Sequence, residues 1–235
     1  MRREEGVLLE VTQFLQTVAI WALPLLLAIT LHEAAHAYAA RELGDPTAAL
    51  LGRVTLNPLR HIDPFGTVVL PLILLLTQVG IVFGYAKPVP VDPRNLRDPR
   101  GGMALVALAG PASNLIQAAA AVVILRLALE NGLSADSPLR SLLTVMVYIN
   151  CLLAVLNMLP IPPLDGGRIL VALLPPQAGA ALEGFSRKGI WLLLAIFFLL
   201  PLFSRQAGLS IDPLAWFVGE PAVALTHLLF RLGGL

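Results

Sequence analysis

Four long stretches without a charged side chain constrain the fold of this chain more than any other feature. They cover residues 11–31, 64–86, 101–125 and 141–164. A helix needs about 20 consecutive apolar residues to cross the hydrocarbon core of a bilayer, and each stretch reaches that length. Composition agrees, because 57% of the 235 residues are hydrophobic and only 13% are charged. The sequence therefore predicts an integral membrane protein.

These stretches predict an all-α polytopic membrane protein with about five to six membrane segments. The first helix is expected to run from about Leu8 to Leu43 and to bend near Pro24. Two further apolar segments, at about 187–204 and 213–233, make up the C-terminal part. No polar stretch is long enough for a soluble domain, so we expect a single membrane-embedded domain over residues 1–235.

The stretch at 64–86 is expected to enter and leave the membrane on one side. Its glycines and prolines suit a re-entrant element, of which a β-hairpin is one form, better than a spanning helix. Basic residues flank it on both sides, and the positive-inside rule places such segments in the cytoplasm. They are Arg41, Arg53 and Arg60 before the stretch and Lys87, Arg94, Arg97 and Arg100 after it.

This topology predicts where the ends of the other stretches meet. The third stretch leads outward and the fourth returns, so that Asn157 and Asp165 reach the cytoplasmic face. His32 lies toward the end of the first helix that faces the same side. Chemistry shared by these residues is therefore expected near the cytoplasmic face of the membrane.

The segment His32-Glu33-Ala34-Ala35-His36 carries the clearest chemical signal. Two histidines four positions apart share one helical face and can bind a single metal ion. Glu33 lies beside them, where it can take a proton from a metal-bound water. Zinc is the usual occupant of such a nitrogen and oxygen site. The alternative is a chance pentapeptide with packed histidines, which the cost of ionisable groups near hydrocarbon disfavours.

A catalytic zinc needs a third protein ligand, and Asp165 is the strongest candidate. It follows a proline-rich stretch that favours an extended backbone, and it precedes Gly166 and Gly167, which allow close backbone packing. From the residues alone, a metal ligand and a helix N-cap are equally good interpretations of Asp165.

Cys151 is the only cysteine, so no cysteine metal site is expected. The net charge of +1 indicates no nucleic acid partner.

Three segments, His32–His36, Gly110–Asn114 and Asn157–Gly167, resemble in order the signature segments of the site-2 protease family of intramembrane zinc metalloproteases. Residues 52–64 and 86–91 are similar to its compact prokaryotic branch, which has no PDZ or CBS domain. The resemblance covers about residues 28–170, the expected catalytic core of the peptidase domain. It implies one Zn²⁺ per chain, held by His32, His36 and Asp165, with Glu33 as the catalytic base.

Two asparagines in the apolar stretches are further candidates for the site. The resemblance assigns Asn157, in the third segment, to substrate binding or to stabilising the oxyanion, since an amide can donate a hydrogen bond to that charge. Asn114 is a candidate for the same role. The alternative for both residues is hydrogen bonding between membrane helices, a common use of asparagine within membranes.

The expected function is that of an intramembrane zinc metalloendopeptidase acting in regulated intramembrane proteolysis. It would hydrolyse peptide bonds within or next to transmembrane helices of membrane-protein substrates in the lipid bilayer. Substrate selection is expected to rest on the membrane core or on a separate regulatory partner, because the chain has no room for a PDZ or CBS domain. The alternatives are a catalytically silent scaffold for membrane helices, which would lack Glu33 or a ligand, and a metal transporter, which would need polar residues along a full path.

Overall fold

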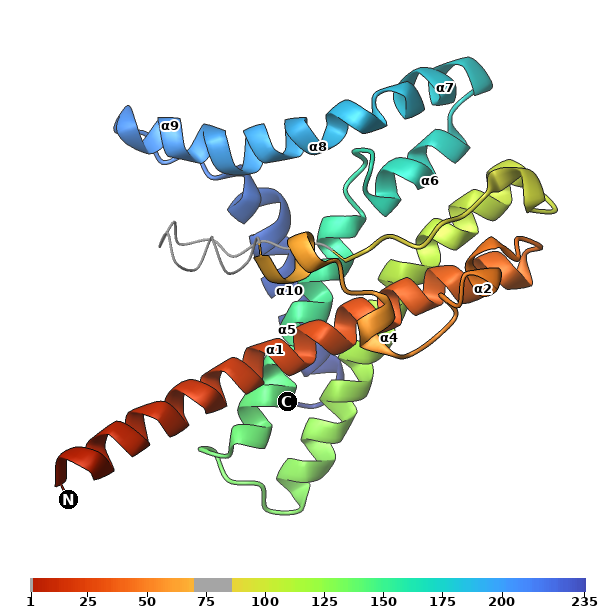
Figure 1. The fold of residues 1–235 in the computed structure, drawn as a ribbon. Coiled ribbons are helices and arrows are strands. Elements are labelled where there is room, and N and C mark those ends of the chain that lie inside the picture. The colour runs from red at the N-terminus through yellow and green to blue at the C-terminus, as the bar shows by residue number, and fades with distance from the viewer. Residues whose placement is uncertain (1, 70–85) are drawn as a thin grey trace. The chain divides into compact units, whose positions relative to one another are not determined.

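All regular structure in the described residues is helical. A computed structural model describes residues 2–69 and 86–235, and no strand occurs among them, which confirms the all-α prediction. Figure 1 shows the arrangement of the longer helices along the chain. The elements are α1 (Arg2–Glu42), α2 (Thr47–Leu50), η1 (Pro58–Arg60), η2 (Pro64–Val69), η3 (Pro93–Asn95), α4 (Pro99–Glu130), α5 (Pro138–Asn157), α6 (Asp165–Leu173), α7 (Pro176–Gly184), α8 (Ser186–Leu194), η4 (Ala195–Leu199), α9 (Leu200–Gln206), η5 (Ala215–Gly219) and α10 (Glu220–Leu232).

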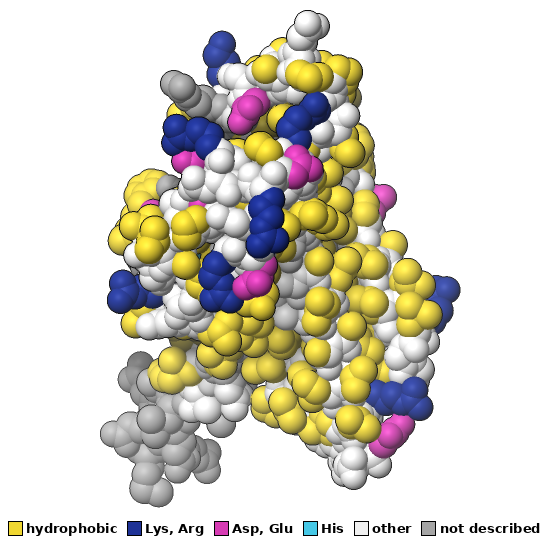
Figure 2. Space-filling view, turned by 90° about the vertical axis from the view of Figure 1, so that its right-hand side faces the viewer, with side chains coloured by type: hydrophobic (Ala, Val, Ile, Leu, Met, Phe, Trp, Pro, Cys, Tyr) yellow, Lys and Arg dark blue, Asp and Glu magenta, His cyan; other side chains and the backbone are white. Residues whose placement is uncertain are grey.

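Among the residues that the structure describes, three helices are long and apolar enough to cross a membrane. They comprise Val11–Glu42 of α1, the whole of α4 and the whole of α5, and a shorter apolar helix follows at Trp191–Ser204. Hydrophobic side chains cover much of the face in Figure 2, as a surface in contact with lipid requires. The polytopic membrane fold is therefore confirmed, whereas the count of five to six segments stays a prediction.

Two details of the predicted segments can be compared with the structure. Helix α1 begins at Arg2, earlier than the predicted start, and keeps Pro24 in its interior. Of the stretch predicted to be re-entrant, residues 64–69 form the helical element η2. The rest of that stretch, 70–85, lies outside the described residues, so the re-entrant element stays a prediction.

The chain divides into two compact units. Unit 1 contains residues 1–28, 114–157 and 191–235, and unit 2 contains residues 29–113 and 158–190. Helices α1 and α4 each contribute one part to either unit. The N-terminal part of α1 belongs to unit 1 and its C-terminal part to unit 2, and the reverse holds for α4.

Unit 1 is built on α4, α5 and α10. Small and branched side chains of α4 and α5 form its core, against which α10 packs. Small residues let two helices approach closely, which is how helices associate in a membrane that offers no hydrophobic driving force between them. The core residues are Ala118, Ala121, Val122, Leu125, Leu143, Val147 and Cys151.

Unit 2 has a small core at the C-terminal part of α1. Ala37 of α1, Ala48 of α2 and Val89 of the segment before η3 are buried together. A second cluster joins Ala40 of α1 to Val106 of α4. Alanines along this part of α1 therefore let loop segments and α4 pack directly onto the helix backbone.

Helix α1 ends in a tight turn that its sequence specifies. Gly44 adopts a positive φ of 113°, a conformation that favours glycine. The N–H of Asp45 donates to the carbonyl of Ala40, and the N–H of Gly44 donates to that of Arg41, which together form a Schellman motif. The turn places the buried carboxylate of Asp45 at the centre of the following loops.

The Asp45 carboxylate joins three segments of unit 2. It accepts hydrogen bonds from the N–H of Thr47 at 3.0 Å, from that of Asp92 at 2.7 Å and from the amide of Asn95 at 3.0 Å. Burial tends to raise the pKa of Asp45, but a hydrogen bond from the Thr47 hydroxyl, together with these three, outweighs it and lowers that pKa below its usual value.

Replacing Asp45 by asparagine is expected to lower the free energy of unfolding by about 1–3 kcal/mol at pH 7, because donors would face an amide N–H₂. Since the folded pKa is lowered, the carboxylate stabilises the fold above the unfolded value of about 4, and this contribution is lost as pH falls through the folded pKa. Thermal unfolding of the purified protein measures the difference, with the exposed Asp136→Asn as control. Equal melting temperatures for both variants at pH 7 would contradict the prediction.

Candidate metal centre

His32 and His36 lie one turn apart on the part of α1 that belongs to unit 2. Their rings are almost fully buried, with 7% and 6% of each residue exposed. The two Nε2 atoms are 3.0 Å apart, and the rings meet edge to face. The spacing of four residues thus presents both imidazoles to one point, as the sequence predicts.

Asp165 reaches the same point from α6. It is the first residue of that helix, and Leu164, with an extended backbone, occupies the N-cap position. The side chain of Asp165 is therefore not the N-cap of α6. Its Oδ2 atom lies 3.2 Å from Nε2 of His32 and 3.3 Å from Nε2 of His36.

Two glycines allow the chain before α6 to fold back onto the start of the helix. A Cβ atom on Gly166 would lie 2.3 Å from the carbonyl oxygen of Met158, and one on Gly167 would lie 2.3 Å from the nitrogen of Pro162. Such contacts exclude any side chain, so the predicted close backbone packing is confirmed. This packing fixes the direction in which Asp165 leaves the backbone.

The three side chains have the geometry of a zinc site. Their ligand atoms lie within 4.8 Å of one another. In a tetrahedral site with bonds of about 2.0–2.1 Å, ligand atoms are about 3.3 Å apart. The separations of 3.0, 3.2 and 3.3 Å match that value. Within the described part of the chain, Oδ2 of Asp165 is buried without a hydrogen-bond partner, and a cation would compensate it.

A backbone carbonyl orients one of the two imidazoles. Nδ1 of His36 lies 2.7 Å from the carbonyl oxygen of Val106 in α4. Because a carbonyl can only accept, we assign the proton to Nδ1, which leaves a lone pair on Nε2. A metal-binding histidine is commonly held in this way.

Gly110 of α4 faces both histidine rings. A Cβ atom there would lie 2.4 Å from Nε2 of His36 and 2.5 Å from Cε1 of His32. Sequence reasoning did not single out this residue, and its place in the segment Gly110–Asn114 was the only signal for it. The absence of a side chain at this position leaves the space in which the imidazoles converge.

Glu33 is held by a backbone N–H of the segment before η3. Its Oε2 atom accepts a hydrogen bond of 3.1 Å from the N–H of Val89. Val89 is itself buried against Ala37 and Ala48, so the donor has a fixed position. The carboxylate next to the metal-binding face is therefore restrained at one of its two oxygens.

The two candidate asparagines lie in unit 1 and make different contacts. Asn114 is fully buried, and its amide donates to Oδ1 of Asn150 at 2.9 Å and to the carbonyl of Ala28 at 3.3 Å, which links α4 to α5 and α1. Asn157 is the last residue of α5, and its amide donates to the carbonyl of Leu153 one turn earlier. The contacts of Asn114 favour the helix-to-helix alternative for that residue.

Known proteins resemble this chain over most of its length. The family described as "Peptidase family M50" matches residues 126–202. The "Putative zinc metalloprotease YwhC" of Bacillus subtilis is 39% identical over 177 residues, which cover 74% of this chain and 77% of that protein. The "Putative zinc metalloprotease Rip2" of Mycolicibacterium smegmatis is 32% identical over 193 residues, 82% of this chain and 70% of that one. No solved structure matches the chain.

The comparisons and the structure agree with the resemblance found in the sequence. A relative with 39% identity over three quarters of both chains establishes the family. The helical fold has helices able to span a membrane, and one of them carries two of the three side chains grouped as a metal site. The chain therefore belongs to peptidase family M50, the site-2 proteases, and is a membrane-spanning zinc metalloprotease.

Proposed function

We propose that this protein is an intramembrane endopeptidase that cleaves peptide bonds within or next to transmembrane helices of other membrane proteins. In this proposal His32, His36 and Asp165 hold one zinc ion, and Glu33 is the general base. The observation that carries it is the convergence of three buried ligand atoms beside the carboxylate of Glu33, on a helix apolar enough to span a membrane. Ionisable groups in such a helix are costly and are functional by default.

The zinc ion and Glu33 would have different roles in the hydrolysis of a peptide bond. Zinc, when bound, lowers the pKa of a water molecule toward about 7 and polarises the carbonyl group that it faces. Glu33 takes up the proton that the attacking water loses, and it later gives that proton to the nitrogen of the leaving amine. The C–O bond to the attacking oxygen forms first, the peptide C–N bond then breaks as its nitrogen takes the proton, and Glu33 ends the cycle as a carboxylate.

The substrate class follows from the apolar setting of the site. A transmembrane helix hides its peptide carbonyls in its own hydrogen bonds, so a substrate helix must unwind locally before its carbonyl can be attacked. From the resemblance to the family we propose Asn157 for substrate binding or for stabilising the oxyanion, because an amide N–H can donate to that charge. For Asn114 the contacts with Asn150 and Ala28 support a helix-linking role instead.

We place the site near the cytoplasmic face of the cell membrane. The loops of unit 2, which also holds the three grouped side chains, carry most of the basic residues that flank the predicted re-entrant stretch. Basic loops are retained in the cytoplasm. Substrates that carry their cleavage position in the cytoplasmic half of their single helix are therefore expected to be preferred.

Glu33→Gln tests this function directly. The variant is expected to lower kcat by about 10²- to 10⁴-fold, because the amide cannot accept the proton, while the zinc content stays at that of the wild type. The measurement is cleavage of a panel of single-span membrane proteins by purified protein in lipid vesicles, with zinc determined by elemental analysis. Glu42→Gln, an exposed change on the same helix, is the matched control.

Each result of this experiment has a distinct meaning. Equal cleavage by the wild type and Glu33→Gln would overturn the assignment of the base. A wild type that binds zinc and the single-span proteins but cleaves none of them would favour the silent scaffold.

A further inference from the structure

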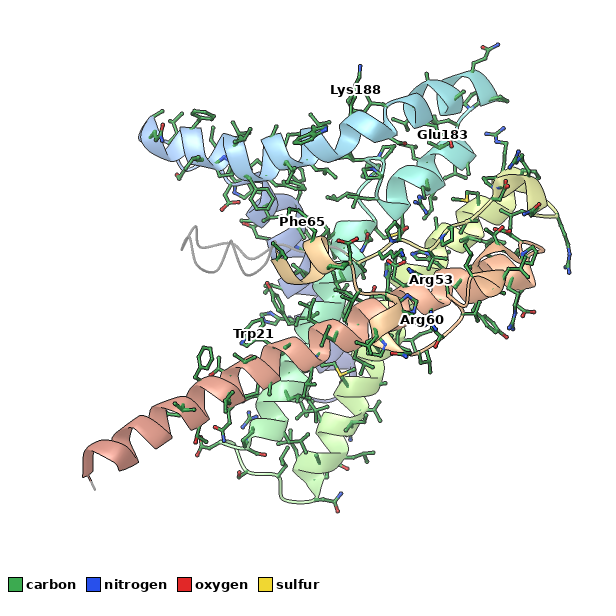
Figure 3. All side chains as sticks on the ribbon, in the orientation of Figure 1. Trp21, Arg53, Arg60, Phe65, Glu183 and Lys188 are labelled. Atoms are coloured by element: carbon green, nitrogen blue, oxygen red, sulfur yellow. The ribbon has the colours of Figure 1, made fainter. Side chains whose placement is uncertain are left out.

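We infer that Arg53 is a positioning residue for Glu33 and acts through the backbone of residues 87–91, here called the 87–91 segment. The inference rests on the proposed role of Glu33 as the base. Arg53 lies in the loop between α2 and η1, and Figure 3 labels it together with Arg60, the last residue of η1. All residues that the inference uses belong to unit 2.

The sequence of the 87–91 segment decides which of its residues have a backbone N–H that can donate a hydrogen bond. Pro88 and Pro90 have no N–H and favour an extended conformation in the residues that precede them. Val89, between the two prolines, therefore presents a single N–H from a stiff backbone. That N–H donates to Oε2 of Glu33 at 3.1 Å.

Arg53 holds the opposite side of the same backbone. Its Nη2 atom donates to the carbonyl of Lys87 and lies 3.5 Å from that of Pro88. The carbonyl of Pro88 and the N–H of Val89 belong to one peptide group, which is planar and rigid. The guanidinium and the Glu33 carboxylate thus flank a single peptide plane, and a shift of one end moves the other.

The burial of Arg53 makes the hydrogen bonds of its guanidinium group to the 87–91 segment important. Only 6% of the residue is exposed, and a buried charge is costly unless it is hydrogen-bonded. Its Nε atom has no partner in the described part of the chain. The hydrogen bonds that compensate the guanidinium therefore go to the 87–91 segment.

Two further contacts hold the segment but do not replace Arg53. The N–H of Lys87 donates to the carbonyl of His61 at 2.9 Å, and the side chain of Val89 packs against Ala37 and Ala48. These contacts fix where the segment lies along α1 and how closely it approaches that helix. The carbonyl contacts with Arg53 fix the rotation of the peptide planes, which decides whether the Val89 N–H points at Glu33.

The first test compares Arg53→Met with Arg60→Met, the same change at the exposed arginine that ends η1. Both are measured on a single-span protein that the wild type cleaves. We expect Arg53→Met to lower kcat by about 10- to 100-fold with KM and zinc content within twofold of the wild type, as for other groups that orient an active residue. Arg53→Lys, which keeps a donor, should recover part of the loss. A kcat for Arg53→Met equal to that of Arg60→Met would overturn the inference.

The second test removes the N–H itself. Val89→Pro deletes the N–H that donates to Glu33, whereas Val89→Ala keeps that N–H and removes the side-chain packing against Ala37 and Ala48. We expect Val89→Pro to lower kcat as much as Arg53→Met does. Adding Arg53→Met to Val89→Pro should lower kcat no further, since both changes act through one peptide group. The coupling would be refuted if the two losses in kcat multiplied in the double variant. It would also be refuted if Val89→Pro and Val89→Ala lowered kcat equally. If Arg53→Met does not fold, Arg53→Lys replaces it in the same comparison.

These outcomes are separable from a failure of the proposed function. If Glu33→Gln retained activity, Glu33 would not be the general base, and the inference about Arg53 would lose its premise. An inactive Glu33→Gln combined with a fully active Arg53→Met would leave the function intact and overturn only the role of Arg53.

Discussion

Replacing Gly110 by alanine is expected to abolish zinc retention and proteolysis while the protein still folds. The added methyl group would lie 2.4 Å from Nε2 of His36 and 2.5 Å from Cε1 of His32. Both atoms are at the far ends of their side chains, so the rings can rotate away without moving α1 or α4. Rotation, however, removes both imidazole nitrogens from the point where Oδ2 of Asp165 meets them.

Purified Gly110→Ala protein should therefore contain less than a tenth of the zinc of the wild type, because a site that loses two of three ligands falls far below the affinity of a complete one. The thermal melting temperature of the metal-free protein should stay close to that of the metal-free wild type. Gly184→Ala is the matched control, since a methyl group there meets no atom within 4 Å. A Gly110→Ala protein with full zinc and activity would show that the close approach of α4 to the histidines is not required.

The residues of the metal site differ in how far the sequence alone could identify them. His32, Glu33 and His36 stand out because ionisable groups are rare in a spanning helix and the helical period places the histidines on one face. Asp165 was undecided between ligand and N-cap from its neighbours alone, and the resemblance to the site-2 proteases favoured the ligand. The structure starts α6 at Asp165 itself, which removes the N-cap alternative.

Gly110 and Arg53 could not be identified from local sequence for a physical reason. A glycine in a helix reveals nothing about which side chains approach it, and its role depends on rings that lie on another helix. The role of Arg53 likewise depends on carbonyls in a segment that is distant along the chain. Such residues are defined by tertiary contacts, and neither hydropathy nor periodicity records those contacts.

The limits of the membrane helices were partly predictable. The fourth uncharged stretch runs on to Leu164, but α5 stops at Asn157 because three prolines follow within six residues. Helix α4 continues beyond its uncharged stretch to Glu130, where Arg126 and Glu130 pair at 2.9 Å and remain exposed. Long charged side chains at a helix end can reach water, so charge alone does not end a membrane helix.

Replacing Asp165 by asparagine is expected to reduce zinc affinity by on the order of 100-fold or more and to bring proteolysis to background. Removal of the negative ligand leaves two neutral imidazoles to hold a doubly charged ion in a buried site, and an uncompensated buried charge is strongly unfavourable. The amide side chain has nearly the same shape, so the packing of Gly166 and Gly167 at the start of α6 should be preserved.

The size of the effect on stability separates a ligand from a structural carboxylate. Zinc at a concentration of 100 times its dissociation constant stabilises a folded protein by about 2.7 kcal/mol, and Asp165→Asn should lose this increment. Without metal, the variant should lose less stability than this increment, because only the contacts of the carboxylate with the imidazoles of His32 and His36 are then removed. Melting temperatures with and without a zinc chelator measure both effects, and Asp136→Asn is the control. A variant that is destabilised equally in both conditions, and that retains zinc after dialysis, would show that Asp165 supports the fold rather than the metal.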